Sequence, residues 1–229
     1  MARQRPDTIP YITSRKGEVP DLASNLRALP DNRGLCYTFE HPRDRCPRGY
    51  LCGRVSQNRH GNELYGEPEW VMVHPGRQRE AMFELRCQVC MGPASRTTDG
   101  YLFLTEPITD GRPYEGLLTA QPPVCLKHAR VSRDQCGHLV RKGAAALRVR
   151  VPRLFGVIGT HYEYSGGKPR VIESDGPPIP YTDERMPWVL ISQLVRRMNG
   201  VTVVDLDQEL TADPQRAGTE TCPGGQLAR

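Results

Sequence analysis

The sequence predicts a small α+β protein with a thin hydrophobic core. Strand-like and helix-like hydrophobic patterns follow one another along the 229 residues. Hydrophobic residues make up only 38%, and 22 glycines with 21 prolines indicate many loops. A core of this kind is commonly supplemented by metal ions or disulfides, and the chain contains 8 cysteines.

The first part of the chain is expected to contain little regular structure. We expect residues 1–20 to be a disordered or extended N-terminus and residues 21–69 to be a loop-rich, cysteine-containing lobe. Asp21 is expected to cap a short helix that ends before Pro30. The apolar face of that helix would consist of Leu22, Leu26 and Leu29.

Residues 70–140 are predicted to form a compact module. The stretch EWVMVHP (69–75) predicts a strand, and PGRQREAMFEL (75–85) predicts a helix with proline in its first turn. Beyond the paired cysteines, DGYLFL (99–104) and GLLTA (116–120) predict two strands. CLKHARVSRDQC (125–136) predicts a helix.

Residues 141–210 are predicted to form an α+β C-terminal part. Two strands, 153–164 and 169–173, would be joined by a Ser-Gly-Gly turn. Asp183 would cap an amphipathic helix that Gly200 ends, and residues 201–207 would form a last strand, which gives a strand–helix–strand segment. The helix would bury Met186, Val189, Leu190, Leu194, Val195 and Met198. We expect residues 211–229 to be a flexible tail.

Cys87 and Cys90 have the spacing of a metal-binding turn. A C-x2-C turn supplies two ligands from one tight loop, and Gly92 lets the backbone curl beneath the sulfurs. A redox dithiol would require the pair at a helix N-terminus, and two inert buried thiols are the other alternative. Here the pair follows a predicted helix, which favours the metal.

Cys125 and His128 can supply the second pair of ligands. Positions i and i+3 in the first turn of a helix lie on one face, so both side chains can reach one ion. The positive end of the helix dipole also favours a thiolate there. Cys136 is the rival fourth ligand, but a continuous helix would carry it about 16 Å along the axis.

The order of knuckle, two strands and helix with a second ligand pair resembles the treble-clef family of zinc fingers. The resemblance covers residues 86–138 and rests on Cys87, Cys90, Cys125 and His128. It implies a zinc ion as cofactor. Four protein ligands would close the coordination shell of zinc, so the implied site is structural.

A second candidate metal set lies in the N-terminal lobe. The C-x9-C-x5-C spacing of Cys36, Cys46 and Cys52 resembles a CCCH zinc finger over residues 36–60. Ser56 stands at the position of that family's histidine. His60, ahead of His41, would then be the fourth ligand, and the alternative is three packed thiols.

Basic residues are concentrated after the second ligand pair. Residues 126–170 hold 10 basic and 2 acidic side chains. Such a block can neutralise phosphates, although the excess of arginine over lysine is also typical of a high-GC, bacterial genome. Candidate nucleic-acid contacts are Lys127, Arg130, Arg133, Arg141, Lys142, Arg148 and Arg150.

These features predict a zinc-stabilised binding protein whose basic face contacts nucleic acid or an acidic protein. The alternatives are an enzyme of a specialised bacterial pathway, with no active site that we can identify, and a non-catalytic assembly factor. No apolar stretch is long enough to span a bilayer, and the N-terminus lacks a signal-peptide core, so we expect a cytoplasmic protein with no membrane contact. In that compartment the cysteines are expected to be metal ligands or free thiols rather than disulfides.

Overall fold

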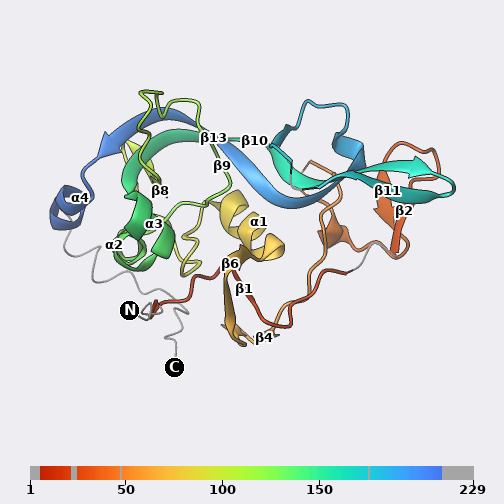
Figure 1. The fold of residues 1–229 in the computed structure, drawn as a ribbon, viewed down its shortest axis with the longest axis horizontal. Coiled ribbons are helices and arrows are strands. Elements are labelled where there is room, and N and C mark those ends of the chain that lie inside the picture. Colours follow the sequence, from red (N-terminus) through yellow and green to blue (C-terminus); the bar gives the residue numbers. More distant parts are fainter. Residues whose placement is uncertain (1–5, 22–24, 47, 175, 213–229) are drawn as a thin grey trace.

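The structure, a computed structural model, describes residues 6–21, 25–46, 48–174 and 176–212. Two long antiparallel strands, β10 (Ala145–Ser165) and β13 (Val189–Val204), run side by side through the molecule (Figure 1). They form the centre of a seven-stranded sheet with the order β7-β8-β10-β13-β9, in which β11 and β12 also pair with β10. The shorter strands are β7 (Arg96–Thr97), β8 (Gly100–Thr105), β9 (Leu118–Thr119), β11 (Lys168–Glu173) and β12 (Ile179–Pro180).

Helices gather mainly at one end of this sheet. Figure 1 shows α2 (Leu126–Gln135), α3 (Gly137–Lys142) and α4 (Leu206–Ala212) near β8, at the end opposite to β11. The same end contains a core cluster that includes Leu102, Leu104 and Cys125. Because β8 pairs with β10 from Ala145 to Val149, the sheet continues across the boundary expected at residue 140.

The N-terminal half forms small two-stranded sheets around the long ribbon. β2 pairs with β3, β4 with β5, and β1 with β6. Their bounds, with those of the 3-10 turns η2 and η3, are β1 (Thr13–Arg15), β2 (Leu26–Ala28), β3 (Leu35–Tyr37), η2 (Pro42–Asp44), β4 (Arg59–His60), β5 (Glu63–Leu64), β6 (Pro68–Val73) and η3 (Met186–Trp188).

Helix α1 (Pro75–Glu84) is attached to β13 through buried polar side chains. The Gln78 amide donates to the Leu194 carbonyl and accepts from the Leu194 N–H, as a paired strand would. Arg79 donates to the carbonyls of Ile191 and Ser192, and Arg196 of β13 donates to that of Met82. These bonds pair side chains of α1 with backbone groups of β13, and the Ile191 carbonyl also accepts from the Gly53 N–H at 2.8 Å.

The α+β class is confirmed, and several expected elements are present. β6 and α1 match the predictions for 69–75 and 75–85, and α2 matches that for 125–136. β10 and β11 form the expected hairpin, with Ser165 opposite Lys168. The strands expected at 99–104 and 116–120 are also present, as β8 and the two-residue β9.

The prediction of an amphipathic helix after Asp183 is wrong, because Val189–Val204 form strand β13. One bulge in β13 explains part of the misleading pattern. In the pairing of β10 with β13, the register shifts between Leu154 and Gly156, where the extra residue lies on β10, and again between Ile158 and Gly159, where β13 carries an extra residue between Ile191 and Gln193. The bulge in β13 interrupts the alternation of its buried side chains, so that Ile191, Leu194 and Val195 follow a spacing that imitates a helical period. Gly200, with φ +65°, lies within the strand and caps no helix.

Two expectations for the N-terminal part also need correction. Leu26–Ala28 is a strand, not part of a helix, while residues 22–24 lie outside the described chain. Residues 13–15, expected to be disordered or extended, form β1 and are buried against the rest of the protein. The flexible tail expected from residue 211 lies outside the described residues beyond Ala212.

Among the helices that the structure describes, none is long and apolar enough to cross a membrane.

Candidate metal centre

Three cysteines and one histidine meet in the core between α1, α2 and the sheet. Cys87 and Cys90 belong to the loop after α1, Cys125 is the N-cap of α2, and His128 lies in the first turn of that helix. All four residues are buried, with exposed fractions of 0% for Cys87 and Cys125, 2% for Cys90 and 3% for His128. The two predicted ligand pairs are therefore brought together.

The loop that carries Cys87 and Cys90 is a tight knuckle. α1 ends at Leu85 in a left-handed conformation, which reverses the chain direction. The Cys87 carbonyl accepts from the Met91 N–H at 2.8 Å, and the Cys87 N–H donates to the Gly92 carbonyl at 2.9 Å. Met91 itself has φ +59°, so the backbone curls back beneath Cys87 and Cys90. This curl directs both sulfurs to one side of the loop.

Helix α2 presents the other two ligands. The Cys125 carbonyl accepts the first helical bond, from the Ala129 N–H at 2.8 Å. His128 follows three residues later, so its ring lies on the same face as Cys125. The His128 Nδ1 atom lies 3.1 Å from Cys125 Sγ and 3.8 Å from Cys87 Sγ.

The donor set and its dimensions fit a tetrahedral metal ion. One ligand atom from each of the four residues lies within 4.8 Å of every other. Ligand bonds of about 2.0–2.3 Å around a tetrahedral zinc place donors roughly 3.5–4 Å apart. Three sulfurs and one imidazole nitrogen, all shielded from water, are therefore compatible with a zinc site.

The electrostatics of the cluster also favour a bound cation. Burial tends to raise the pKa of the Cys87 thiol, but hydrogen bonds from Cys125, Cys90 and His128 together lower it well below its ordinary value. Hydrogen bonding to Cys87 and Cys90, followed by burial, raises the pKa of Cys125. Three thiolates in one dry cluster repel each other, and a divalent cation offsets this repulsion.

Cys136 does not belong to the cluster. It follows the ten residues of α2 as the C-cap of that helix, whereas His128 faces the three sulfurs. The continuous helix carries Cys136 about 16 Å along the axis from Cys125. His128 is thus the fourth member of the group.

The second candidate set is not brought together. Cys46 and Cys52 form a disulfide with each other, which corrects the expectation that the cysteines are metal ligands or free thiols. Cys36 is a free, partly exposed thiol on β3, and His60 is exposed on β4. His41 caps η2 by accepting from the Arg43 N–H. Within the described residues, the group around Cys87 is the one that can hold an ion.

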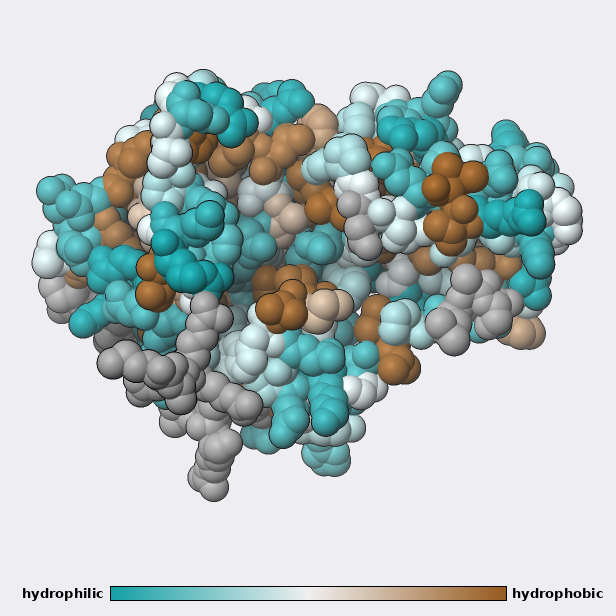
Figure 2. Space-filling view, viewed as in Figure 1, coloured by the Kyte–Doolittle hydropathy of each residue, from teal (hydrophilic) through white to brown (hydrophobic). Residues whose placement is uncertain are grey.

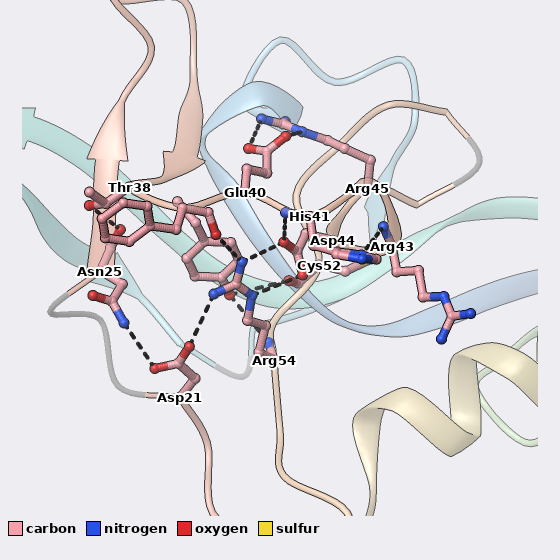
Figure 3. Close-up of polar contacts among 12 residues, drawn as sticks. Asp21, Asn25, Thr38, Glu40, His41, Arg43, Asp44, Arg45, Cys52 and Arg54 are labelled. Atoms are coloured by element: carbon pink, nitrogen blue, oxygen red, sulfur yellow. Dashed lines mark hydrogen bonds and ion pairs between the residues drawn. The ribbon is translucent and has the colours of Figure 1, made fainter.

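An arginine network organises the N-terminal lobe (Figure 3). Arg54 donates through Nε and Nη2 to the Asp44 carboxylate, and through Nη2 to the Phe39 carbonyl at 2.6 Å. Its guanidinium carbon lies 4.0 Å from the centre of the Tyr37 ring. Together with the disulfide, these contacts stabilise the turn-rich chain that the cysteine spacing alone predicted to bind zinc.

The basic block is divided by the fold. Lys127 and Arg130 of α2 are exposed, as are Arg141 and Lys142 in the last turn of α3. Figure 2 shows mainly hydrophilic residues over the lobe that contains these helices. Arg150 of β10 is also exposed, 3.7 Å from Asp99.

Two predicted contact residues, Arg148 and Arg133, form ion pairs within the chain, and only Arg148 is buried. The Arg148 side chain is 1% exposed and is paired with Glu209 of α4, and its Nη1 donates to the carbonyls of Ser95 and Gly100. It is therefore unavailable to an external partner, contrary to the prediction. Arg133 forms ion pairs with Asp134 and Asp207 at 2.9 and 2.7 Å. No sequence spacing indicated the pairings with Glu209 and Asp207, because α4 is distant in the chain from both arginines.

Comparison with known proteins adds no relative: no protein-family model, no curated protein and no solved structure matches this chain.

Proposed function

We propose that Cys87, Cys90, Cys125 and His128 bind one zinc ion in a treble-clef-like arrangement, and that the ion is structural. The observation that carries this proposal is the closed, buried set of four protein ligands. A catalytic zinc needs an open position for water or substrate, whereas four protein donors complete the tetrahedron.

Bound zinc would connect segments that backbone bonds join only partly. The knuckle contacts the segment before α2 through one bond, from the Gln88 N–H to the Pro123 carbonyl. That segment reaches the sheet through the Val124 N–H, which donates to the Leu102 carbonyl. An ion held by both ligand pairs would fix the end of α1 to α2 and so hold α2 against the sheet.

The protein so stabilised is proposed to be a binding protein rather than an enzyme. Its contact surface would be the α2–α3 basic face, defined by Lys127, Arg130, Arg141 and Lys142. These four side chains are exposed, and Arg130 has only a 4.0 Å approach to Asp134. The partner would be nucleic acid or an acidic protein, because closely spaced cations favour polyanions.

Salt dependence tests this proposal directly. We expect duplex DNA or single-stranded RNA to bind with a slope of log K against log salt of about −3 to −4, as four phosphate contacts give. Replacing all four basic-face residues by glutamine should abolish that binding. A matched control replaces Arg43, Arg112, Arg153 and Lys168 by glutamine. These residues are exposed, and their replacement removes the same number of positive charges.

A third probe, polyglutamate, distinguishes an acidic protein partner from nucleic acid. Polyglutamate binding without nucleic-acid binding would assign an acidic protein as the partner. Absence of binding to all three probes, or equal losses in the basic-face and control variants, would overturn the proposed contact surface.

A further inference from the structure

Part of β6 projects from the ladder that this strand forms with β1. Pro68 of β6 faces Arg15 and Val73 faces Thr13, so five steps along β6 correspond to two steps along β1. The residues between these two positions, 69–72, therefore cannot follow β1 and leave the ladder as a large bulge. We call residues 69–72 the β6 finger.

The tip of the β6 finger is apolar and open to solvent. Val71 is 93% exposed, Met72 55% and Trp70 37%. A group of exposed apolar side chains with polar residues beside it commonly marks a surface that contacts a partner. Glu69, at the base of the finger, is also exposed and forms no ion pair with any residue that the structure describes. The finger thus presents apolar side chains next to one unpaired negative charge.

A cavity of complementary shape lies between α4 and the sheet. Its volume of about 450 Å³ falls in the roughly 300–1,000 Å³ of sites that enclose small ligands, so it has room for the side chains of a finger tip. The apolar part of its wall consists of Leu126, Val203, Val204 and Ala212. Figure 1 shows α4 beyond one end of the sheet and β6 below its middle, so the finger of one molecule lies away from its own cavity.

The charged groups of the cavity wall already have partners within the molecule. Arg148 is paired with Glu209, and the Asp205 carboxylate accepts from the N–H groups of Asp207 and Gln208. An apolar side chain that enters the cavity therefore leaves no lone buried charge behind, which is the main cost of filling a polar site.

Two exposed arginines flank the same cavity. Arg130 lies four residues after Leu126 on α2, and therefore on the same face of that helix. Arg96 lies between Ser95 and Thr97, which both line the cavity. The rim of the cavity is thus basic, whereas the base of the finger is acidic, and charges of opposite sign favour contact between them.

We propose that the β6 finger of one molecule inserts into the α4 cavity of a second copy of this chain, so that molecules associate head to tail. A finger and a cavity at different places on one chain make a heterologous contact, which extends into a ring or a filament. An anionic lipid surface is a poorer partner, because it repels Glu69. This association goes beyond the proposed function, and Arg130 is the residue that it shares with the α2–α3 basic face.

The test measures the molar mass of the zinc-loaded, full-length protein by sedimentation equilibrium. We expect the average mass of the wild type to rise between about 10 µM and 1 mM, since contacts smaller than about 1,200 Å² are weak. Val71→Asp at the finger tip and Val203→Asp at the cavity should each stay monomeric. Val171→Asp is the matched control, because Val171 belongs to neither surface and is 57% exposed, as Val203 is.

A mixture of the two monomeric variants tests the head-to-tail arrangement itself. Val71→Asp retains its cavity and Val203→Asp retains its finger, so an equimolar mixture should form a dimer that does not grow further. A wild type that remains monomeric, undiminished association of Val71→Asp, or a mixture without dimer would overturn the proposal. Binding to phosphatidylcholine vesicles that Val71→Asp loses, without association between copies, would also overturn it and would assign the finger to a lipid surface.

Neither substitution changes the α2–α3 basic face. Binding of nucleic acid or polyglutamate by Val71→Asp and Val203→Asp should therefore equal that of the wild type at concentrations where the wild type is monomeric. Loss of association with retained polyanion binding, or the reverse, distinguishes failure of the head-to-tail contact from failure of the proposed function.

Discussion

Cys125 Sγ lies 3.1 Å from His128 Nδ1, and both residues belong to the first turn of α2. The helix alone thus positions half of the candidate metal site. The other half consists of Cys87 and Cys90. They belong to the knuckle, which precedes β7 and β8 in the sequence, whereas α2 follows those strands. An ion bound by both halves would therefore link two segments that otherwise share few backbone bonds.

The first prediction concerns this link. Cys87→Ser should reduce the zinc content from about one ion per chain to none, and should destabilise the protein by about 3 kcal/mol or more. The reason is that the free energy of binding a structural zinc contributes directly to folding. Elemental analysis and urea unfolding on the same samples provide both measurements.

Cys136→Ser is the matched control for the metal site. Cys136 is a free cysteine at the opposite end of α2, so its substitution should leave the zinc content unchanged. The wild type should hold one ion, since Cys46 and Cys52 are joined in a disulfide. Two ions per chain, or a Cys87→Ser variant that retains its zinc, would contradict the assignment.

The cluster of three cysteines and one histidine could be predicted from the sequence because its geometry is local within each half. A C-x2-C turn and a Cys-x2-His pair in a first helical turn each fix two donors at short range. The hydrophobic residues around both pairs are expected to be buried, so the two pairs are expected to meet in the interior. The N-terminal cysteines had no such local pairing with a histidine, and Cys46 and Cys52 pair with each other instead.

The sheet was harder to predict because its bulges are set by long-range pairing. The register of β10 with β13 shifts twice, once with the extra residue on β10 and once with it on β13. The buried role of Arg148 was hidden for a similar reason. It depends on Glu209, 61 residues away in the chain.

A second prediction concerns one of these irregular positions. A side-chain Cβ at Gly156 would lie 2.0 Å from the Ile179 carbonyl oxygen, so Gly156→Ala must displace β12 from β10. We expect a loss of about 1–3 kcal/mol in urea unfolding, as for other overpacked sites. Gly137→Ala, where the nearest atom belongs to the flexible Arg141 side chain, is the control and should be neutral or slightly stabilising. Equal stabilities of the two variants would refute the close approach of β12.

A third prediction addresses the ion pair between α4 and the sheet. Glu209→Gln should destabilise the protein by about 2–4 kcal/mol, because it leaves the buried Arg148 charge without its carboxylate. The control is Asp207→Asn. Asp207 lies on α4, as Glu209 does, and its carboxylate pairs with Arg133 of α2. Since that pair is largely exposed, the control should cost at most about 1 kcal/mol. Similar losses in both variants would show that Arg148 is not an enclosed charge.

The last prediction is the pH dependence contributed by Asp44. Hydrogen bonds from Arg54 hold the pKa of the Asp44 carboxyl below its ordinary value. A group whose folded-state pKa is depressed stabilises the protein above its unfolded-state pKa, and this contribution is lost as the pH falls through the folded-state pKa. Asp44→Asn should therefore cost about 1–2 kcal/mol at neutral pH, and the difference from wild type should shrink below about pH 4.

Comparison of the two proteins at each pH isolates this contribution, because loss of zinc from protonated thiols affects both equally. Urea unfolding from pH 7 to pH 3 gives the difference directly. Asp99→Asn serves as the control, since its carboxylate is exposed and lies 3.7 Å from Arg150. A difference for Asp44→Asn that stays constant or widens towards pH 3 would mean that Arg54 does not stabilise the ionised carboxylate, and that the N-terminal lobe is held chiefly by its disulfide and apolar contacts.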